Sequence, residues 1–186
     1  MATVNEKWLS RQKVDAATMN RAAYQPIRTL SDPPYFRATG IGNTAAIQKE
    51  TSISWMESDT AGGFRTSNMT DFKPPVPGIY WVTATIAMTT PSTMDGTQST
   101  AALILQVGTT SKAGSPAILK GFTTTKVKGS YQSVHVAGLM FIANDQTIWA
   151  SAEGIGGAWT KPKSGNPATS LASFSAVLIS ADATSL

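Results

Sequence analysis

The chain has 186 residues and no cysteine, only 14% of its residues are charged, and its formal net charge is +4 at pH 7. This length suffices for one substantial domain with an arm, and the lack of cysteine excludes disulfides and zinc–thiolate sites. Basic residues are dispersed, no apolar run reaches about 18 residues, and no secretion signal is evident, so neither nucleic acid nor a membrane is expected as a partner.

Residues 1–33 are predicted to form an N-terminal arm that precedes the main domain. Residues 3–6 have the spacing of a helix capping box, and Asp15 could cap a second short helix. Helices this short need a surface on which to dock. The arm is expected to end at residues 32–34, where two consecutive prolines stiffen the backbone as a hinge.

Residues 34–186 are predicted to form a single all-β domain, because short β segments alternate with turns rich in Gly, Pro, Asn and Ser. Asn144 and Asp145 are expected to form a hairpin turn, and residues 154–169 a long connection before the last strand. The predicted strands cover residues 35–41, 46–57, 78–89, 100–108, 117–124, 131–143, 146–152 and 171–180.

The segment 78–89 is predicted to be a central strand. It follows a proline-rich entry and alternates two residue sets, both of them largely apolar. A strand with two semi-apolar faces must be covered on both sides, and we expect a second sheet on one side and another subunit on the other. The last strand, 171–180, is also apolar and is expected to lie inside a sheet, as in a jelly roll.

Four motifs follow one another in an order that resembles a known family. They are Gly63-Phe64, then Phe72 with Pro77-Gly78-Ile79-Tyr80, then Phe141 with Asn144-Asp145 and Trp149, and finally Ser173-Phe174-Ser175-Ala176. Together they resemble the globular head of the first complement component and its tumour-necrosis-factor relatives. The chain departs from that pattern at Asn144 and Ala176, where the family usually has glycine, and it lacks a collagen-like stalk.

The resemblance implies a jelly-roll β-sandwich of about ten strands that forms a tight homotrimer, with aromatic and aliphatic side chains meeting at the three-fold axis. It implies no ligand. The side chains expected near subunit contacts are Tyr35, Trp81, Leu139, Phe141 and Val177. The alternative is that these side chains are ordinary core residues of a monomeric sandwich.

The residue inventory offers no positive case for catalysis, and neither a cofactor nor a metal is expected. His135 is the only histidine, and no recognisable motif sets an acid or a nucleophile beside it. Glu57 and Asp59 could form a carboxylate pair with loop acids such as Asp71 or Asp95, but their spacing matches no calcium-binding loop. We therefore expect a protein that is not an enzyme.

The sequence favours a structural protein of a virion, made in the host cytoplasm, that decorates a bacteriophage head as a cement trimer. The absence of cysteine, the surface rich in Thr, Ser and Gly, and the arm joined by a hinge all fit this role. The major capsid protein would be its partner. The arm residues expected to bind the capsid are Trp8, Leu9, Arg11, Lys13, Val14, Met19 and Arg21.

The alternative function is the receptor-binding tip of a phage tail fibre, in which variable loops would recognise a cell-surface glycan. It shares the fold and the trimer with the first hypothesis. The short arm argues against it, because 33 residues leave no room for a fibre shaft.

Overall fold

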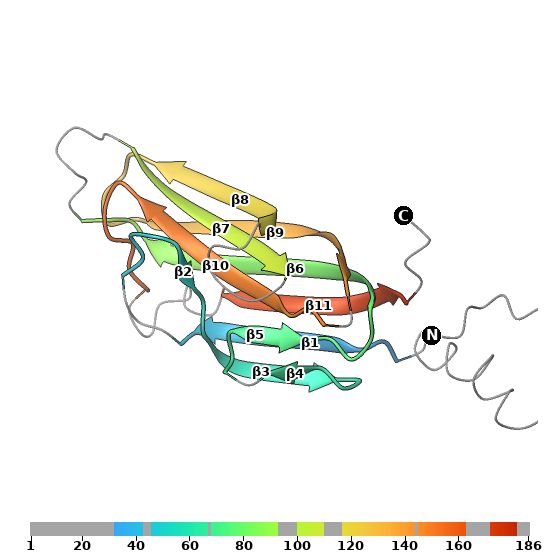
Figure 1. The fold of residues 1–186 in the computed structure, drawn as a ribbon. Coiled ribbons are helices and arrows are strands. Elements are labelled where there is room, and N and C mark those ends of the chain that lie inside the picture. The colour runs from blue at the N-terminus through green and yellow to red at the C-terminus, as the bar shows by residue number, and fades with distance from the viewer. Residues whose placement is uncertain are drawn as a thin grey trace, which may run out of the picture.

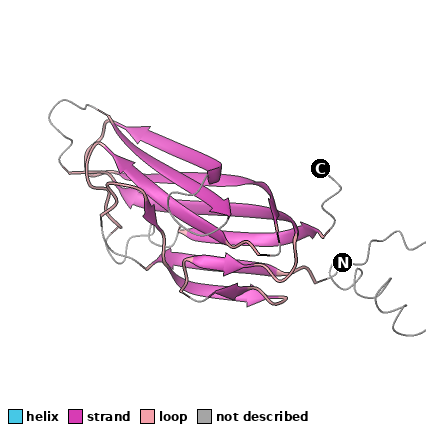
Figure 2. Ribbon diagram, viewed as in Figure 1, coloured by secondary structure: helices cyan, strands magenta, loops and turns pink. Residues whose placement is uncertain are grey.

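The computed structural model describes residues 32–42, 46–66, 68–92, 100–109, 117–143, 145–162 and 172–181. The predicted arm, residues 1–33, lies outside this range except for its last two residues. Within the described part every regular element is a β-strand, and no helix is drawn (Figure 2).

The strands form two antiparallel sheets, which confirms an all-β sandwich. One sheet has five strands in the order β3-β1-β11-β6-β9, and the other has the order β4-β5-β10-β7-β8, with β2 added beside β10 (Figure 1). The strands are β1 (Tyr35–Ile41), β2 (Thr51–Ser52), β3 (Trp55–Ala61), β4 (Arg65–Thr66), β5 (Asp71–Lys73), β6 (Gly78–Thr89), β7 (Ala101–Thr109), β8 (Ala117–Thr125), β9 (Tyr131–Ile142), β10 (Ile148–Ile155) and β11 (Ser173–Ser180).

The last strand, β11, lies inside the five-stranded sheet, between β1 and β6, as its apolar sequence predicted. Its alternate residues Phe174, Ala176 and Leu178 are buried between the sheets. An apolar strand in this position has both edges paired, so it leaves no open edge for aggregation.

The core between the sheets contains a cluster of phenylalanines. The rings of Phe36 on β1 and Phe72 on β5 are stacked with centroids 4.1 Å apart, and Phe174 meets Phe36 edge-on at 4.9 Å. All three side chains are fully buried. Because they come from different sheets, this cluster holds the two layers together.

Gly78 begins the central strand β6 at a point where no side chain fits. A β-carbon there would collide with the carbonyl oxygen of Ser180 and would lie 2.8 Å from the Leu178 side chain. Glycine after Pro77 therefore allows β6 to start directly against the end of β11.

Three sequence predictions were wrong in detail. The connection at 144–145 does not join a hairpin, because β9 and β10 belong to different sheets. The single strand expected at 46–57 is divided, because β2 pairs with β10 in one sheet and β3 pairs with β1 in the other. Residues 53–54 carry the chain between the sheets, and the amide of Ile53 donates to the carbonyl of Ala150 at 2.9 Å.

The glycine-rich segment 154–157 is not all loop, since Gly154 and Ile155 complete β10. Gly154 packs so closely on Ile47 and Trp159 that no side chain fits there, which explains a glycine inside a strand. Gly156 then turns the chain with φ at +82°. The short strands β4 and β5 were not predicted, because two or three residues carry too little periodicity.

Candidate interaction surface

The outer side of the five-stranded sheet, which faces away from the second sheet, carries one row of apolar side chains. Tyr35 on β1 is paired with Val177 on β11, Val177 with Trp81 on β6, and Trp81 with Leu139 on β9. These four residues, here called the outer apolar row, therefore cross four neighbouring strands in register. Side chains that are directly opposite on adjacent strands lie about 5 Å apart, so the row is continuous.

The outer apolar row is not part of the core. Trp81 is 43% exposed and Leu139 is 48% exposed, whereas Tyr35 and Val177 are half-buried. Phe141, the fifth predicted contact residue, is 43% exposed on the same side of β9. The reading of Trp81, Leu139 and Phe141 as core residues of a monomer is therefore wrong.

Two further apolar residues belong beside the outer apolar row but were missed from the sequence. Ile79, which is opposite Phe141, is almost fully buried, and Ile179 is 50% exposed near the end of β11. Each lies two residues from Trp81 or Val177, so the two-residue period of a strand would have found them. Contiguous exposed apolar side chains with a polar border are typical of association surfaces.

The border of the outer apolar row on the side away from Ile79 and Phe141 is polar. In the next row, the hydroxyls of Thr83 and Ser175 hydrogen-bond at 2.8 Å. In the row after that, Thr85 hydrogen-bonds the Nδ1 atom of His135, also at 2.8 Å. The outer side of the sheet thus passes from aromatic and aliphatic groups at one end to hydroxyl and imidazole groups in its middle.

Tyr35 links the apolar row to the edge of the sheet. Its hydroxyl donates to Oδ2 of Asp59 on β3 at 3.1 Å. This hydrogen bond, followed by the negative charge of Asp59, raises the pKa of Tyr35 above its ordinary value. The aromatic ring and the carboxylate therefore form one connected feature of the surface.

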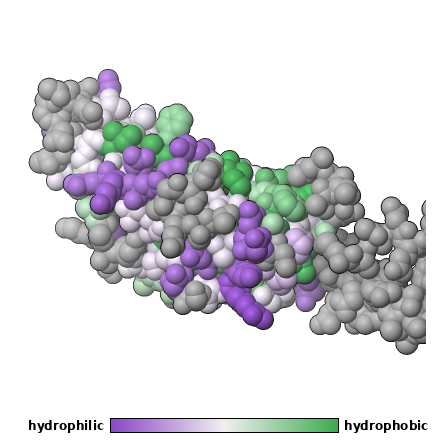
Figure 3. Space-filling view, viewed as in Figure 1, coloured by the Kyte–Doolittle hydropathy of each residue, from purple (hydrophilic) through white to green (hydrophobic). Residues whose placement is uncertain are grey.

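A second group of exposed apolar side chains lies on β8, at the edge of the other sheet. Ile118 is 51% exposed and Phe122 is 73% exposed, with Lys120 between them on the same side of the strand. Figure 3 shows green hydrophobic groups along the upper margin of the molecule, where Figure 1 places β8. No role was predicted for these residues from the sequence.

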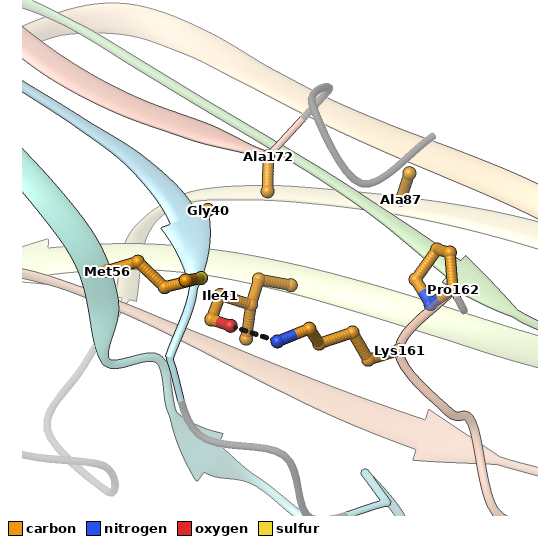
Figure 4. A pocket seen from close by; sticks show the side chains of 7 residues that line it. All are labelled: Gly40, Ile41, Met56, Ala87, Lys161, Pro162 and Ala172. Atoms are coloured by element: carbon orange, nitrogen blue, oxygen red, sulfur yellow. Dashed lines mark hydrogen bonds between the residues drawn. The ribbon is translucent and has the colours of Figure 1, made fainter. Parts of the chain in front are cut away.

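A small pocket lies between the end of β1 and the end of β6, next to Ala172, the residue that precedes β11 (Figure 4). It is lined by apolar groups and by Lys161, whose Nζ donates to the carbonyl of Ile41 at 2.9 Å. This bond ties the chain after β10 to β1, so Lys161 has a structural role here. Its lining residues are Gly40, Ile41, Met56, Ala87, Lys161, Pro162 and Ala172.

Acidic and imidazole groups do not converge in the part of the chain that the structure describes. No group of three or more His, Asp or Glu residues there could hold a metal ion. Glu57 and Asp59 lie on β3 at one edge of the five-stranded sheet, and His135 lies on β9 at the other.

The described residues contain no helix that is long and apolar enough to cross a membrane.

The predicted capsid-binding residues of the arm, from Trp8 to Arg21, lie outside the described residues, as do Asp95 and Asn144. No protein-family model matches the chain, and no curated protein matches it either.

Proposed function

We propose that this chain is a non-enzymatic structural protein of a virion, a homotrimeric decoration protein that docks on a bacteriophage head through residues 1–33. The observation that carries the proposal is the outer apolar row. The row places apolar side chains in register across four strands, and two of them, Trp81 and Leu139, are more than 40% exposed. Apolar surface is unfavourable in water, and association would remove this surface from it.

The jelly-roll topology is part of this proposal and is supported by the strand order. In a jelly roll the first and last strands are neighbours inside one sheet, and the chain passes repeatedly between the sheets. Here β1 and β11 are adjacent, while β5 and β6 belong to different sheets, as do β9 and β10. The described strands are therefore compatible with the fold that the motif resemblance implies.

The trimer is supported by the character of the outer apolar row. The row combines an exposed tryptophan, a tyrosine and two aliphatic residues, and aromatic residues are enriched at protein interfaces. Hydroxyl groups beside the row would lie at the rim, where polar residues are common. Three copies arranged with this side inward would cover all three rows together.

The capsid-docking role is inferred from the sequence of the arm. Trp8, Leu9, Val14 and Met19 would supply apolar anchors, while Arg11, Lys13 and Arg21 would complement an acidic shell. The organisation of a β head behind a short arm is similar to that of phage cement trimers, which is an analogy and not a shared motif.

The test is to delete residues 1–24 and to measure both assembly and binding to phage heads that lack the protein. We expect a soluble trimer by light scattering that no longer sediments with the heads, while the full chain does. Retained head binding by the shortened chain would refute the role of the arm.

A full-length trimer that ignores heads but binds host cells would instead favour the tip of a tail fibre. A full chain that scatters light as a monomer of about 20 kDa at micromolar concentration would refute the trimer itself.

A further inference from the structure

A closed trimer needs two different surfaces on each copy, because each copy binds the previous one with one surface and the next one with the other. If the outer apolar row faces the axis, the two edges of the five-stranded sheet become the places where neighbouring copies meet. These edges are β3 on one side and β9 on the other, where β8 of the second sheet lies close to β9. This inference rests on the trimer proposed above.

The two edges carry opposite charge. The strand β3 contains two acids, Glu57 and Asp59, and no basic residue. The hairpin of residues 117–143, which contains β8 and β9, carries three lysines and the only histidine but no acid. A surface whose two edges differ in this way is complementary to a second copy of itself in a head-to-tail arrangement.

Glu57 is the acid available for such a contact. Asp59 accepts the hydroxyl of Tyr35 and is opposite Arg37 on the neighbouring strand. Glu57 is opposite Thr39, which is uncharged, and its side chain is exposed. Among the described residues no hydrogen bond or ion pair engages it.

Glu57 and His135 are the two ends of a single cross-strand row. The register runs from Glu57 to Thr39, Ser173, Thr85 and His135. The two residues therefore lie at the same position along the strand direction. Rotation about an axis parallel to the strands does not change that position, so it can bring Glu57 of one copy beside His135 of the next.

Lys120 adds a second basic side chain near the His135 edge. Glycine at position 121 lets β8 approach β9, since a β-carbon there would lie 2.8 Å from the carbonyl oxygen of His135. Lys120 and Phe122 are the two neighbours of Gly121 on β8, and both are exposed. Near Glu57, Met56 is 61% exposed, so each edge combines an apolar side chain with its charge.

We propose that neighbouring copies meet edge to edge, with Glu57 of one copy facing His135 and Lys120 of the next. The contact is heterologous, and three such contacts close the ring around the outer apolar row. The charges at the edges set the direction of assembly, because two acidic or two basic edges repel each other.

The test uses the absence of native cysteine in the chain. In the full-length double variant Glu57→Cys/His135→Cys, the two cysteines of one copy are separated by four strand spacings, about 19 Å. Disulfides require α-carbons within about 7 Å, so a bond can form only between copies. Oxidation should give covalent trimers on denaturing gels, whereas each single variant and the control Glu57→Cys/Asp145→Cys should remain uncrosslinked.

The possible results separate this inference from the proposed function. If the wild-type chain is a trimer by light scattering but the double variant gives no crosslink, or only covalent dimers, the edge-to-edge contact is refuted and the trimer stands. A wild-type monomer refutes both.

Charge reversal provides a second measurement that needs no oxidation. Glu57→Lys and Lys120→Glu should each raise, by about tenfold, the protein concentration below which the trimer dissociates. The combined variant should return this concentration most of the way to the wild-type value. If the combined variant is no better than either single one, the two residues do not meet.

Discussion

Trp81 on β6 and Val177 on β11 lie directly opposite each other on the outer side of the five-stranded sheet, and Trp81 is 43% exposed there. The opposite side of β6 is fully buried at Tyr80 and Val82. The central strand thus places one set of residues in the core and leaves the tryptophan of the other set partly in solvent. The proposed association of copies through the outer apolar row would remove Trp81 from water.

The first prediction is that Trp81→Asp converts the proposed trimer to monomers in sedimentation velocity. In the trimer the new carboxylate would be buried without a partner at the centre of the outer apolar row. Burying an unpaired charge is so unfavourable that the subunits should separate. The matched control is Ile155→Asp, because Ile155 is 41% exposed on β10 of the other sheet. An intact Trp81→Asp trimer, or equal dissociation by the control, would contradict the placement.

The second prediction concerns the phenylalanine cluster. Phe72→Ala should lower the free energy of unfolding by about 3–5 kcal/mol, because the cavity cannot close around rings held by both sheets. Val127→Ala, at a side chain that is 60% exposed in the β8–β9 turn, should change it by less than about 0.5 kcal/mol. Urea denaturation at one fixed protein concentration measures both, and similar values would show that the cluster does not hold the layers together.

The periodicity of the long strands was sufficient to predict much of the fold. The bounds of β1 and β6 were predicted correctly, and the position of β11 followed from its apolar sequence. In each case a two-residue alternation extends over seven residues or more, so the buried side is fixed by many side chains at once.

The change of sheet at residues 53–54 could not be predicted, because it depends on pairing partners far away in the sequence. Local sequence does not reveal that Thr51 pairs with Ala152 while Trp55 pairs with Ile41. For the same reason the register that aligns Glu57 with His135 was not evident. The separate residues were visible in the sequence, but their common row depends on four long-range pairings.

The third prediction is that Gly78→Ala destabilises the domain by about 1–3 kcal/mol, the usual cost of overpacking a tight site. The added methyl group would collide with the backbone carbonyl of Ser180, which can move only if β11 moves. Gly129→Asn is the control, since Gly129 has φ at +64° with open space around it and asparagine tolerates that conformation. Thermal unfolding of both variants should lower Tm only for Gly78→Ala, and an unchanged Tm there would contradict the close contact.

The fourth prediction is that Tyr35 ionises above the ordinary tyrosine pKa of about 10 and that Asp59→Asn removes most of this shift. The hydroxyl can donate to the Asp59 carboxylate only while it is protonated, and the negative charge opposes a phenolate beside it. A pKa that is raised in the folded state means that this contact stabilises the fold below about pH 10 and that its contribution disappears as the pH rises through the folded-state pKa.

The measurement is the pH dependence of the tyrosine ζ-carbon NMR shift. Tyr80, whose pKa is raised by burial and which donates to the carbonyl of Val76 at 2.7 Å, should be unaffected by Asp59→Asn. If Tyr35 titrates alike in both proteins, the Tyr35–Asp59 hydrogen bond is not formed in solution.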